Sequence, residues 1–239
     1  MSMAGDLGQI HGHLNPEPNS ITFIGESHQR PESVRLFRSM INEHLKQGDC
    51  LTVALEIASN QQDTIEKIGR DGVTAADIDI APAIDHQAYR DMLDSLAALR
   101  NAGACLSLVA IDAGFGNKMR RDEWMAMQLA KRAGETPILV LLGNLHTLKR
   151  VNWDPAMVEY SPYAAEILAS EGENVRSYSQ LWAGDCASQA RFIEPDSPEA
   201  LGLLNQHLIS LLNAFDYQTA RGVVDGIIAW ECDKRPRGN

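Results

Sequence analysis

The sequence lacks the features that mark membrane, nucleic-acid-binding and secreted proteins. No apolar run is long enough to cross a bilayer, and the N-terminus has neither the charged start nor the apolar segment of a signal peptide. The formal net charge is -11 and no run of Lys or Arg occurs, which argues against a nucleic-acid or anionic-membrane surface. We therefore expect a cytoplasmic protein that binds neither nucleic acid nor a membrane.

Several familiar signatures are also missing. Cys50, Cys105, Cys186 and Cys232 form no CxxC pair, so we expect buried or idle thiols rather than a disulfide framework or a zinc site. Gly114-Phe115-Gly116 lacks the spacing of a dinucleotide or phosphate loop and is expected to be a flexible turn. Ser27 is not in a GxSxG turn, which makes it a weak nucleophile candidate.

What the chain does have is the size and pattern of a globular α/β protein. Its 239 residues can bury a sizeable core. Residues 1–19 contain glycine, asparagine and two prolines without periodicity, and we expect a flexible N-terminal arm. Residues 20–239 are expected to form a single domain.

Short apolar runs alternate with helical patterns along that domain. The runs predicted to be strands are 21–24, 51–55, 106–111, 138–142, 175–181 and 223–230. The predicted helices are 31–47, 89–102 and 120–133, with two more opened by Ser161-Pro162 and Ser197-Pro198. A helix and a loop are expected in 60–84, and a loop or lid in 185–197. Apolar strands alternating with helices indicate a mainly parallel sheet covered on both faces.

Titratable residues follow the carboxyl ends of four successive predicted strands. These residues are Glu26 and His28, then Glu56, then Asp112, then His146, and the pair Arg121 and Asp122 opens the helix after the third strand. Ligands of open parallel sheets bind at this edge, so we expect the side chains to meet there. Each one alone would be explained as a turn residue, a cap or an ion-pair partner. Together they predict an active site.

We divide the predicted site into two groups. The predicted catalytic residues are Glu26, His28, Glu56, Arg121, Asp122 and His146. The predicted substrate-binding residues are Gly25, Ser27, Tyr89, Asp112 and Asn144. Gly25 and Gly143 would let the backbone turn sharply or approach a ligand closely.

Four short motifs in this region resemble those of the erythromycin esterase/ChaN-like superfamily. They are ITFIGESH, LTVALE, RRDEWMAMQLA and ILVLLGNLHTLKR, in order between about residues 20 and 150, and Tyr89 on the intervening helix also fits. More distantly, the paired GxxH motifs at 25–28 and 143–146 resemble the TraB/TIKI group. The resemblance implies a three-layer α/β/α sandwich. It fades beyond residue 150, where substrate-determining parts are expected.

Members of this superfamily open a macrolide lactone, cleave peptides with a metal ion, or bind haem, so the resemblance leaves several functions open. Our leading hypothesis is a hydrolase of an ester, lactone or amide bond in a small molecule. In a metal-free version, Glu56 or Glu26 takes a proton from water with the help of a histidine, Arg121 holds an anionic group or the oxyanion, and Asp122 orients a partner.

In a second, TIKI-like version, His28, His146 and Glu56 bind a divalent metal ion (Mn, Co or Zn) that lowers the pKa of bound water. The rival class is a binding protein for haem or another ligand without chemistry, with haem the less favoured cofactor. A degenerate family member with only an interaction role is a third reading. The intact Glu26, His28, Glu56, Arg121 and His146 count against it.

Overall fold

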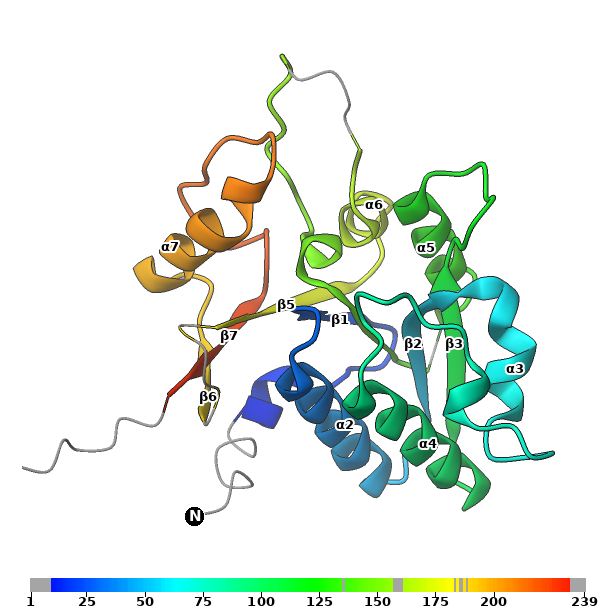
Figure 1. Ribbon diagram of the computed structural model, residues 1–239. Helices are drawn as coiled ribbons and strands as arrows, with labels where there is room; N and C mark the ends of the chain where they lie inside the picture. The colour runs from blue at the N-terminus through cyan, green and yellow to red at the C-terminus, as the bar shows by residue number, and fades with distance from the viewer. Residues whose placement is uncertain are drawn as a thin grey trace, which may run out of the picture.

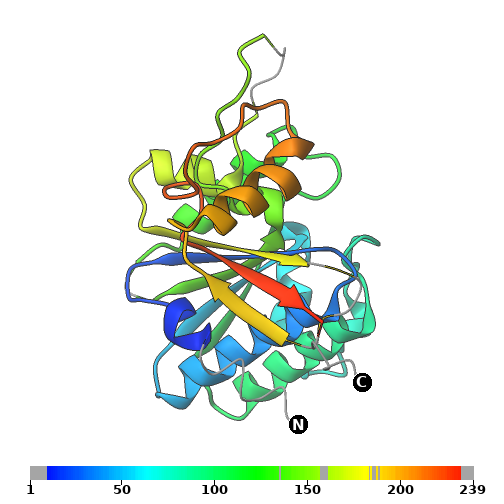
Figure 2. The ribbon, with the colours of Figure 1, turned by 90° about the vertical axis from the view of Figure 1, so that its left-hand side faces the viewer.

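A seven-stranded sheet forms the centre of the computed structural model, which describes residues 10–134, 136–156, 161–182, 184, 187 and 189–232. The strands are β1 (Ile21–Glu26), β2 (Leu51–Ala58), β3 (Leu106–Asp112), β4 (Ile138–Gly143), β5 (Val175–Trp182), β6 (Gln189–Ile193) and β7 (Gly226–Glu231). Their order is β3-β2-β4-β1-β5-β7-β6. All neighbours are parallel except β6 and β7, which Figure 2 shows pointing in opposite directions.

Helices cover both faces of this sheet, as predicted (Figure 1). On one face lie α2 (Pro31–Lys46) and α4 (Gln87–Asn101), and on the other lie α5 (Arg121–Ala130), α6 (Ala164–Ser170) and α7 (Pro198–His207). The short α3 (Gln62–Lys67) flanks the β3 edge. Separate apolar clusters fill the space between the sheet and each helical layer. The mainly parallel α/β/α sandwich is thereby confirmed.

The central strands are mainly apolar because neither face meets water. Every residue of β1 and of β4 is buried. The two strands are adjacent, and the last residue of each is paired with the other, Glu26 with Gly143. The carboxyl ends of β2, β4 and β1 therefore lie side by side.

The N-terminal arm is the first feature that departs from expectation. Residues 10–14 are helical, and Ile10 and Leu14 are buried in the cluster beneath α2 and α4. Their i, i+4 spacing places both side chains on one helix face. The arm is thus packed against the domain from residue 10 onward, and residues 1–9 lie outside the described part of the chain.

Three expectations about the C-terminal half were also wrong. The helix expected at Ser161-Pro162 begins at Ala164. The segment expected to be a loop or lid contains β6, an edge strand that extends the sheet. The helix expected to open at Ser197-Pro198 was predicted to carry Leu201, Leu204, Leu208, Leu211 and Leu212 on one face. It is shorter than that, because α7 ends at His207 and a separate 3₁₀ turn, η4 (Ile209–Leu211), follows.

The expectation of idle thiols was wrong as well. Cys50 and Cys105 form a disulfide, with their Cα atoms 4.6 Å apart and 55 residues between them in sequence. Cys232 is also disulfide-bonded, and Cys186 lies outside the described residues. Cys50 immediately precedes β2 and Cys105 immediately precedes β3, so the bond joins the starts of two neighbouring strands. It lies at the end of the sheet opposite the predicted site.

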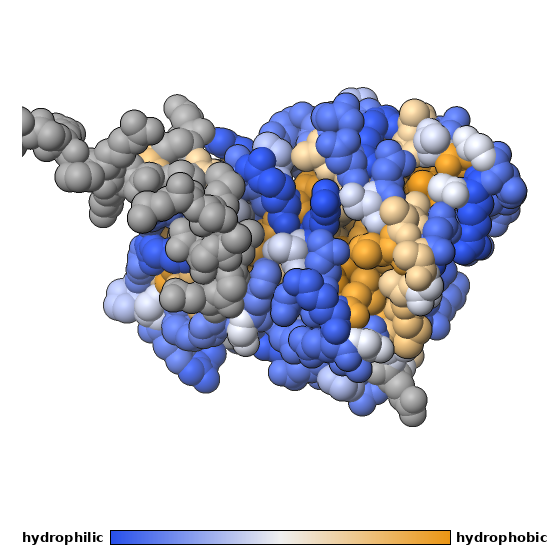
Figure 3. Space-filling model, turned by 90° about the horizontal axis from the view of Figure 1, so that it is seen from below, coloured by the Kyte–Doolittle hydropathy of each residue, from blue (hydrophilic) through white to orange (hydrophobic). Residues whose placement is uncertain are grey.

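The outer surface carries few large apolar side chains. Among the described residues, no helix combines the length and apolar composition that a bilayer crossing requires. The face that bears α2 and α4 is mainly hydrophilic, with narrow apolar hollows between polar ridges (Figure 3). Of the residues that the structure describes, the exposed large apolar side chains are Phe115, Met119, Leu211 and Phe215.

Candidate active site

The sheet order brings the predicted catalytic residues to one edge. Glu56 lies on β2, Glu26 at the end of β1, and His146 in the 3₁₀ turn η3 (Asn144–Thr147) that follows β4. Because β4 lies between β1 and β2, residues from three separate segments converge there. Arg121 and Asp122 reach them from the first turn of α5.

Glu26 and His28 form the first histidine-carboxylate pair. Nδ1 of His28 lies 2.9 Å from Oε1 of Glu26, whose side chain is only 2% exposed, whereas the His28 side chain is 45% exposed. The hydrogen bond to Glu26 raises the pKa of His28 above its ordinary 6.5, against the opposing effect of burial. With Nδ1 directed at the carboxylate, Nε2 is the ring nitrogen left to face the solvent side.

The turn that carries His28 is held from outside. Gln29 adopts a φ of +64°, a left-handed conformation uncommon for a residue with a side chain. Its side-chain amide donates to the carbonyls of Pro82 and Ala83 at 3.1 and 2.9 Å. The segment before α4 thus fixes the position of the histidine.

Asp122 and His146 form a second pair. Nδ1 of His146 lies 2.6 Å from Oδ1 of Asp122, and both side chains are mostly buried. The same Oδ1 accepts the backbone N–H of Ala164 at 2.9 Å, so Asp122 also caps the start of α6. The ring of Tyr163 packs edge-on against His146 at 5.6 Å. Two contacts therefore orient this imidazole, and the Ala164 N–H fixes the carboxylate that makes one of them.

Arg121 connects the carboxylates at the centre of the site. Its guanidinium donates to both carboxylate oxygens of Asp112, at 2.8 and 3.1 Å, and also to Oε1 of Glu56. Nη1 lies 3.3 Å from Nε2 of His146. Burial alone would lower the pKa of Arg121, but the bond to Asp112 and the charges of Glu56 and Asp112 raise it. Counting the described residues, four of the five guanidinium N–H groups have partners, which leaves one on Nη1.

Glu56 occupies an irregular position in its strand. Between Leu55 and Ala58, β2 has one residue more than the facing segment of β3, which is the pattern of a β-bulge. Oε2 of Glu56 accepts the backbone N–H of Gly143 at 3.0 Å, while Oε1 holds Arg121. With both oxygens engaged, Glu56 is placed to hold the arginine and the end of β4 rather than to accept a proton from water.

Two glycines make room for this arrangement. A Cβ on Gly143 would lie 3.3 Å from Cε1 of His28 and 3.6 Å from Cδ2 of His146, so both imidazoles pack against this one residue. A Cβ on Gly25 would lie 2.1 Å from Oδ1 of Asn144. The missing side chain of Gly25 therefore lets β1 lie close to Asn144 of η3. The missing side chain of Gly143 lets the two histidine rings pack close to the backbone.

Three predicted substrate-binding residues have other surroundings than expected. Asn144 donates to the carbonyl of Gln180 and accepts its N–H, at 2.8 and 2.9 Å, which ties η3 to β5. Tyr89 is 1% exposed, and the negative charges of Glu26 and Glu56 add to burial in raising its pKa well above 10. Within the described part of the chain, its hydroxyl has no hydrogen-bond partner, and neither has Oε2 of Glu26. Asp112 holds Arg121, as described above.

Both histidines of the two histidine-carboxylate pairs line a cavity of about 370 Å³. Glu26, Ser27, His28, Asn144 and His146 line its polar side. The other side is mainly apolar and consists of residues from η3, the end of β5, and the α7–η4 segment, with His207 among them. Arg30, which lies over the Trp182 ring, also lines the cavity. Apart from the general expectation that substrate-determining parts lie beyond residue 150, no sequence motif marked this second side. Its members look like ordinary core residues of a strand and a helix.

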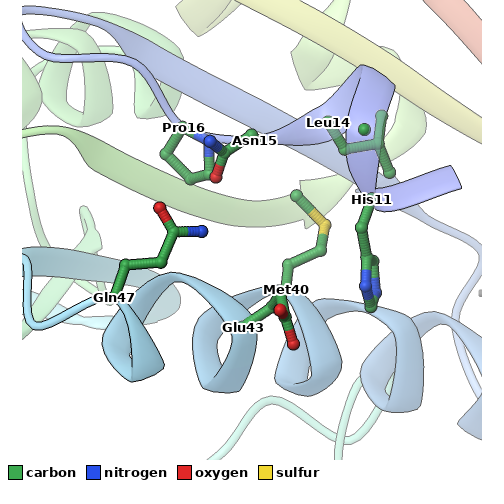
Figure 4. A pocket seen from close by; sticks show the side chains of 8 residues that line it. His11, Leu14, Asn15, Pro16, Met40, Glu43 and Gln47 are labelled. Carbon is green, nitrogen blue, oxygen red and sulfur yellow. The ribbon is translucent and has the colours of Figure 1, made fainter. Parts of the chain in front are cut away.

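A second hollow lies elsewhere. Figure 4 shows it between residues 11–16 and α2, and its volume is about 300 Å³. His11, which lines it, bonds through Nε2 to the Ser39 hydroxyl at 2.8 Å. None of the predicted site residues lines this hollow.

The predicted metal ligands do not fit a divalent ion in this arrangement. Glu56 has both oxygens engaged, and Nε2 of His146 faces the positively charged Arg121. In the part of the chain that the structure describes, no three His, Cys, Asp or Glu side chains are grouped to hold a metal.

Comparison with known proteins gives a fold but no close relative. No family model matches the sequence. No curated protein matches it either.

Solved structures do match the fold. A mutant of the erythromycin esterase EreC in its open conformation has a TM-score of 0.55 and 12% identity, covering 87% of this chain and 90% of its own. A protein from Bacillus cereus has a TM-score of 0.65 and 10% identity, covering 97% and 92%. Haem-bound ChaN of Campylobacter jejuni has a TM-score of 0.50 and 11% identity, covering 97% and 93%. The chain therefore has the erythromycin esterase/ChaN-like fold.

Proposed function

We propose that this protein is a hydrolase that cleaves an ester, lactone or amide bond in a small molecule without a metal ion. The observation that carries the proposal is the pair of carboxylate-bound histidines packed against Gly143, with Arg121 held beside one of them. A positioned base, a fixed cation and an adjoining cavity are the elements that acyl transfer to water needs.

His28 is the proposed general base. A neutral imidazole whose Nδ1–H donates to Glu26 presents a lone pair on Nε2, which can take a proton from water. Glu26 stabilises the imidazolium that forms, in line with the raised pKa of His28. The imidazolium then returns the proton to the leaving oxygen or nitrogen.

Arg121 is the proposed oxyanion contact. The remaining Nη1 N–H can donate to the oxygen that becomes negative as water adds to the carbonyl. His146, held by Asp122 and facing Nη1, keeps this group in place. Glu56 and Asp112 fix the opposite side of the guanidinium. In this proposal His28 takes the place of Glu56 or Glu26, the bases expected from the sequence.

The test is a panel of esters, lactones and amides, followed by chromatography and mass spectrometry on chelator-treated protein. His28→Asn should lower kcat/KM by about 10²–10⁴-fold on any member that is cleaved, the usual contribution of a general base. His13→Asn is the matched control, because it removes an exposed histidine near Glu194 that lies outside the site. Equal loss in both variants would contradict the assignment.

Binding without turnover is the second candidate, supported by the structural likeness to a haem-bound ChaN. In that case the exposed His28 is the side chain placed to meet the ligand. Haem titration would then give a new visible absorbance band that His28→Asn removes, while no panel member is cleaved.

A further inference from the structure

The cavity beside the catalytic pairs has an apolar side that the proposed chemistry does not use. Its members are Leu145 of η3, Leu181 and Trp182 of β5, and Leu208 and Leu211 of the α7–η4 segment. We call these five residues the apolar wall. They share this cavity with Glu26, His28 and His146, and also with His207 and with Arg30, whose guanidinium lies over the Trp182 ring at 5.7 Å from its centroid.

The apolar wall is held in place from behind. The Trp182 ring stacks on that of Trp230 with 6.1 Å between centroids and 15° between planes. Trp230 is fixed in turn, because its Nε1 donates to Oε1 of Gln180 at 2.9 Å. Leu181 and Leu208 are 6% and 3% exposed and belong to the core cluster beneath α7. The cavity therefore has a prearranged apolar surface.

Leu211 distinguishes this wall from ordinary core. A single exposed leucine is unremarkable in a protein. Leu211, however, is 69% exposed and lines the same cavity as the catalytic pairs. The break between α7 and η4 separates it from the helix whose Leu204 is fully buried. Its side chain is thus available to a bound molecule.

We infer that the apolar wall is the subsite for an aliphatic or aromatic group attached to the bond that is cleaved. This inference rests on the proposed hydrolase function and names its substrate class: a small molecule with an apolar portion directly beside an ester, lactone or amide. A carbonyl placed near Nε2 of His28 would leave the apolar portion to cover the exposed Leu211. Burying that portion supplies the binding free energy.

Binding can be tested without turnover. The probes are methyl ketones from 2-butanone to 2-decanone, which keep a carbonyl but have no bond to hydrolyse, titrated by ligand-observed NMR. Kd should fall about two- to fourfold for each added methylene, the range expected when a methylene is partly to fully buried. Leu211→Ser should weaken binding of the longest ketones about three- to tenfold and flatten this dependence.

Phe215→Ser is the matched control, because Phe215 is similarly exposed, at 51%, and does not line the cavity. A Kd that is independent of chain length would overturn the inference. So would a Leu211→Ser variant that binds like wild type, or an equal effect of Phe215→Ser. If the ketones behave as expected but no ester, lactone or amide is cleaved, the subsite stands and the proposed hydrolase function fails. If instead a panel member is hydrolysed but the Kd of the ketones does not depend on chain length, the proposed hydrolase function stands and the subsite fails.

Discussion

Oε2 of Glu56 accepts the backbone N–H of Gly143 at 3.0 Å and thereby links the bulge of β2 to the end of β4. The other oxygen of the same carboxylate holds Arg121. Glu56 therefore connects the backbone that positions the histidines with the cation that faces His146. Because both of its oxygens are engaged in this way, Glu56 has a structural role and is not the proton acceptor.

Replacing this carboxylate should disable the site without unfolding the protein. In Glu56→Gln, Arg121 loses one of its two anionic partners and shifts toward Asp112. We expect kcat/KM to fall by at least about 10²-fold, as when an oxyanion donor is removed. The same change at Glu123, which pairs with Arg120 on the surface, is the control and should alter activity little.

Steady-state kinetics together with thermal unfolding would check this prediction. A Glu56→Gln variant with wild-type activity would show that Arg121 does not need its bond to the Glu56 carboxylate. A variant that has lost activity and also its folded circular dichroism spectrum would assign Glu56 to the fold instead.

A methyl group at Gly143 should separate the two histidines. The φ of Gly143 is -55°, so alanine introduces no backbone strain, but its Cβ would lie 3.3 Å from the His28 ring. We expect Gly143→Ala to lower kcat/KM about tenfold or more, because catalytic groups tolerate little displacement.

Gly202→Ala is the comparison for that variant. A Cβ at Gly202, within α7, would meet nothing within 4 Å. It should raise the free energy of unfolding by about 0.5–1 kcal/mol, the usual helix preference for alanine over glycine, and leave kcat/KM as it is. If both alanines leave the rate unchanged, the packing of the histidines on Gly143 has no catalytic importance.

The pH dependence of activity should follow His28. A general base works only when it is neutral, and the bond to Glu26 raises the pKa of His28 above 6.5. The rate should therefore rise with pH through a midpoint above 6.5, and fall as His28 becomes protonated below it. Glu26→Gln removes the main cause of the shift and should move the midpoint to lower pH.

Two readouts test that account. The pH profile of kcat/KM gives the midpoint for the free enzyme, and NMR titration of the His28 ring gives its pKa directly. A Glu26→Gln midpoint equal to or above that of wild type would contradict the assigned pairing.

The disulfide should contribute to stability but not to catalysis. It closes a 55-residue separation at the end of the sheet away from the site. Cys50→Ser/Cys105→Ser should lower the free energy of unfolding by about 2–4 kcal/mol with kcat/KM preserved, as measured by urea unfolding and kinetics. Unchanged stability would contradict the role given to this bond.

The disulfide also bears on location. Such bonds persist in oxidising compartments and are rare in reducing ones. The cytoplasmic location expected from the sequence remains a prediction, and the Cys50–Cys105 bond weighs against it. A thiol count on denatured, unreduced protein from its native source would measure how much of the bond forms there.

The sequence predicted which residues meet at the site, because this depends only on the direction of the strands. Parallel strands end at one edge, so Glu26 and His146 could be expected together before the strand order was known. The order itself could not be read, because nothing local places β4 between β1 and β2. For the same reason the disulfide was missed: Cys50 and Cys105 become neighbours only once β2 and β3 are known to pair.

Other errors had local causes. β6 is five residues long with the sequence QARFI, too short and too polar to stand out as a strand. Ile10 and Leu14 did carry a helical spacing, but Gly and Pro nearby favoured a loop. The bulge that redirects Glu56 follows from strand pairing, so the role of its carboxylate could not be predicted from the residue type.

The most direct test of the central claim is hydrolysis of the best panel substrate in ¹⁸O-labelled water, with wild type, His28→Asn and His13→Asn compared by mass spectrometry. We predict that wild type and His13→Asn place one ¹⁸O in the acid product at similar rates, and that His28→Asn does so about 10²–10⁴-fold more slowly. A His28→Asn variant that hydrolyses the substrate at the wild-type rate, or a wild-type protein that hydrolyses no member of the panel, would contradict the account.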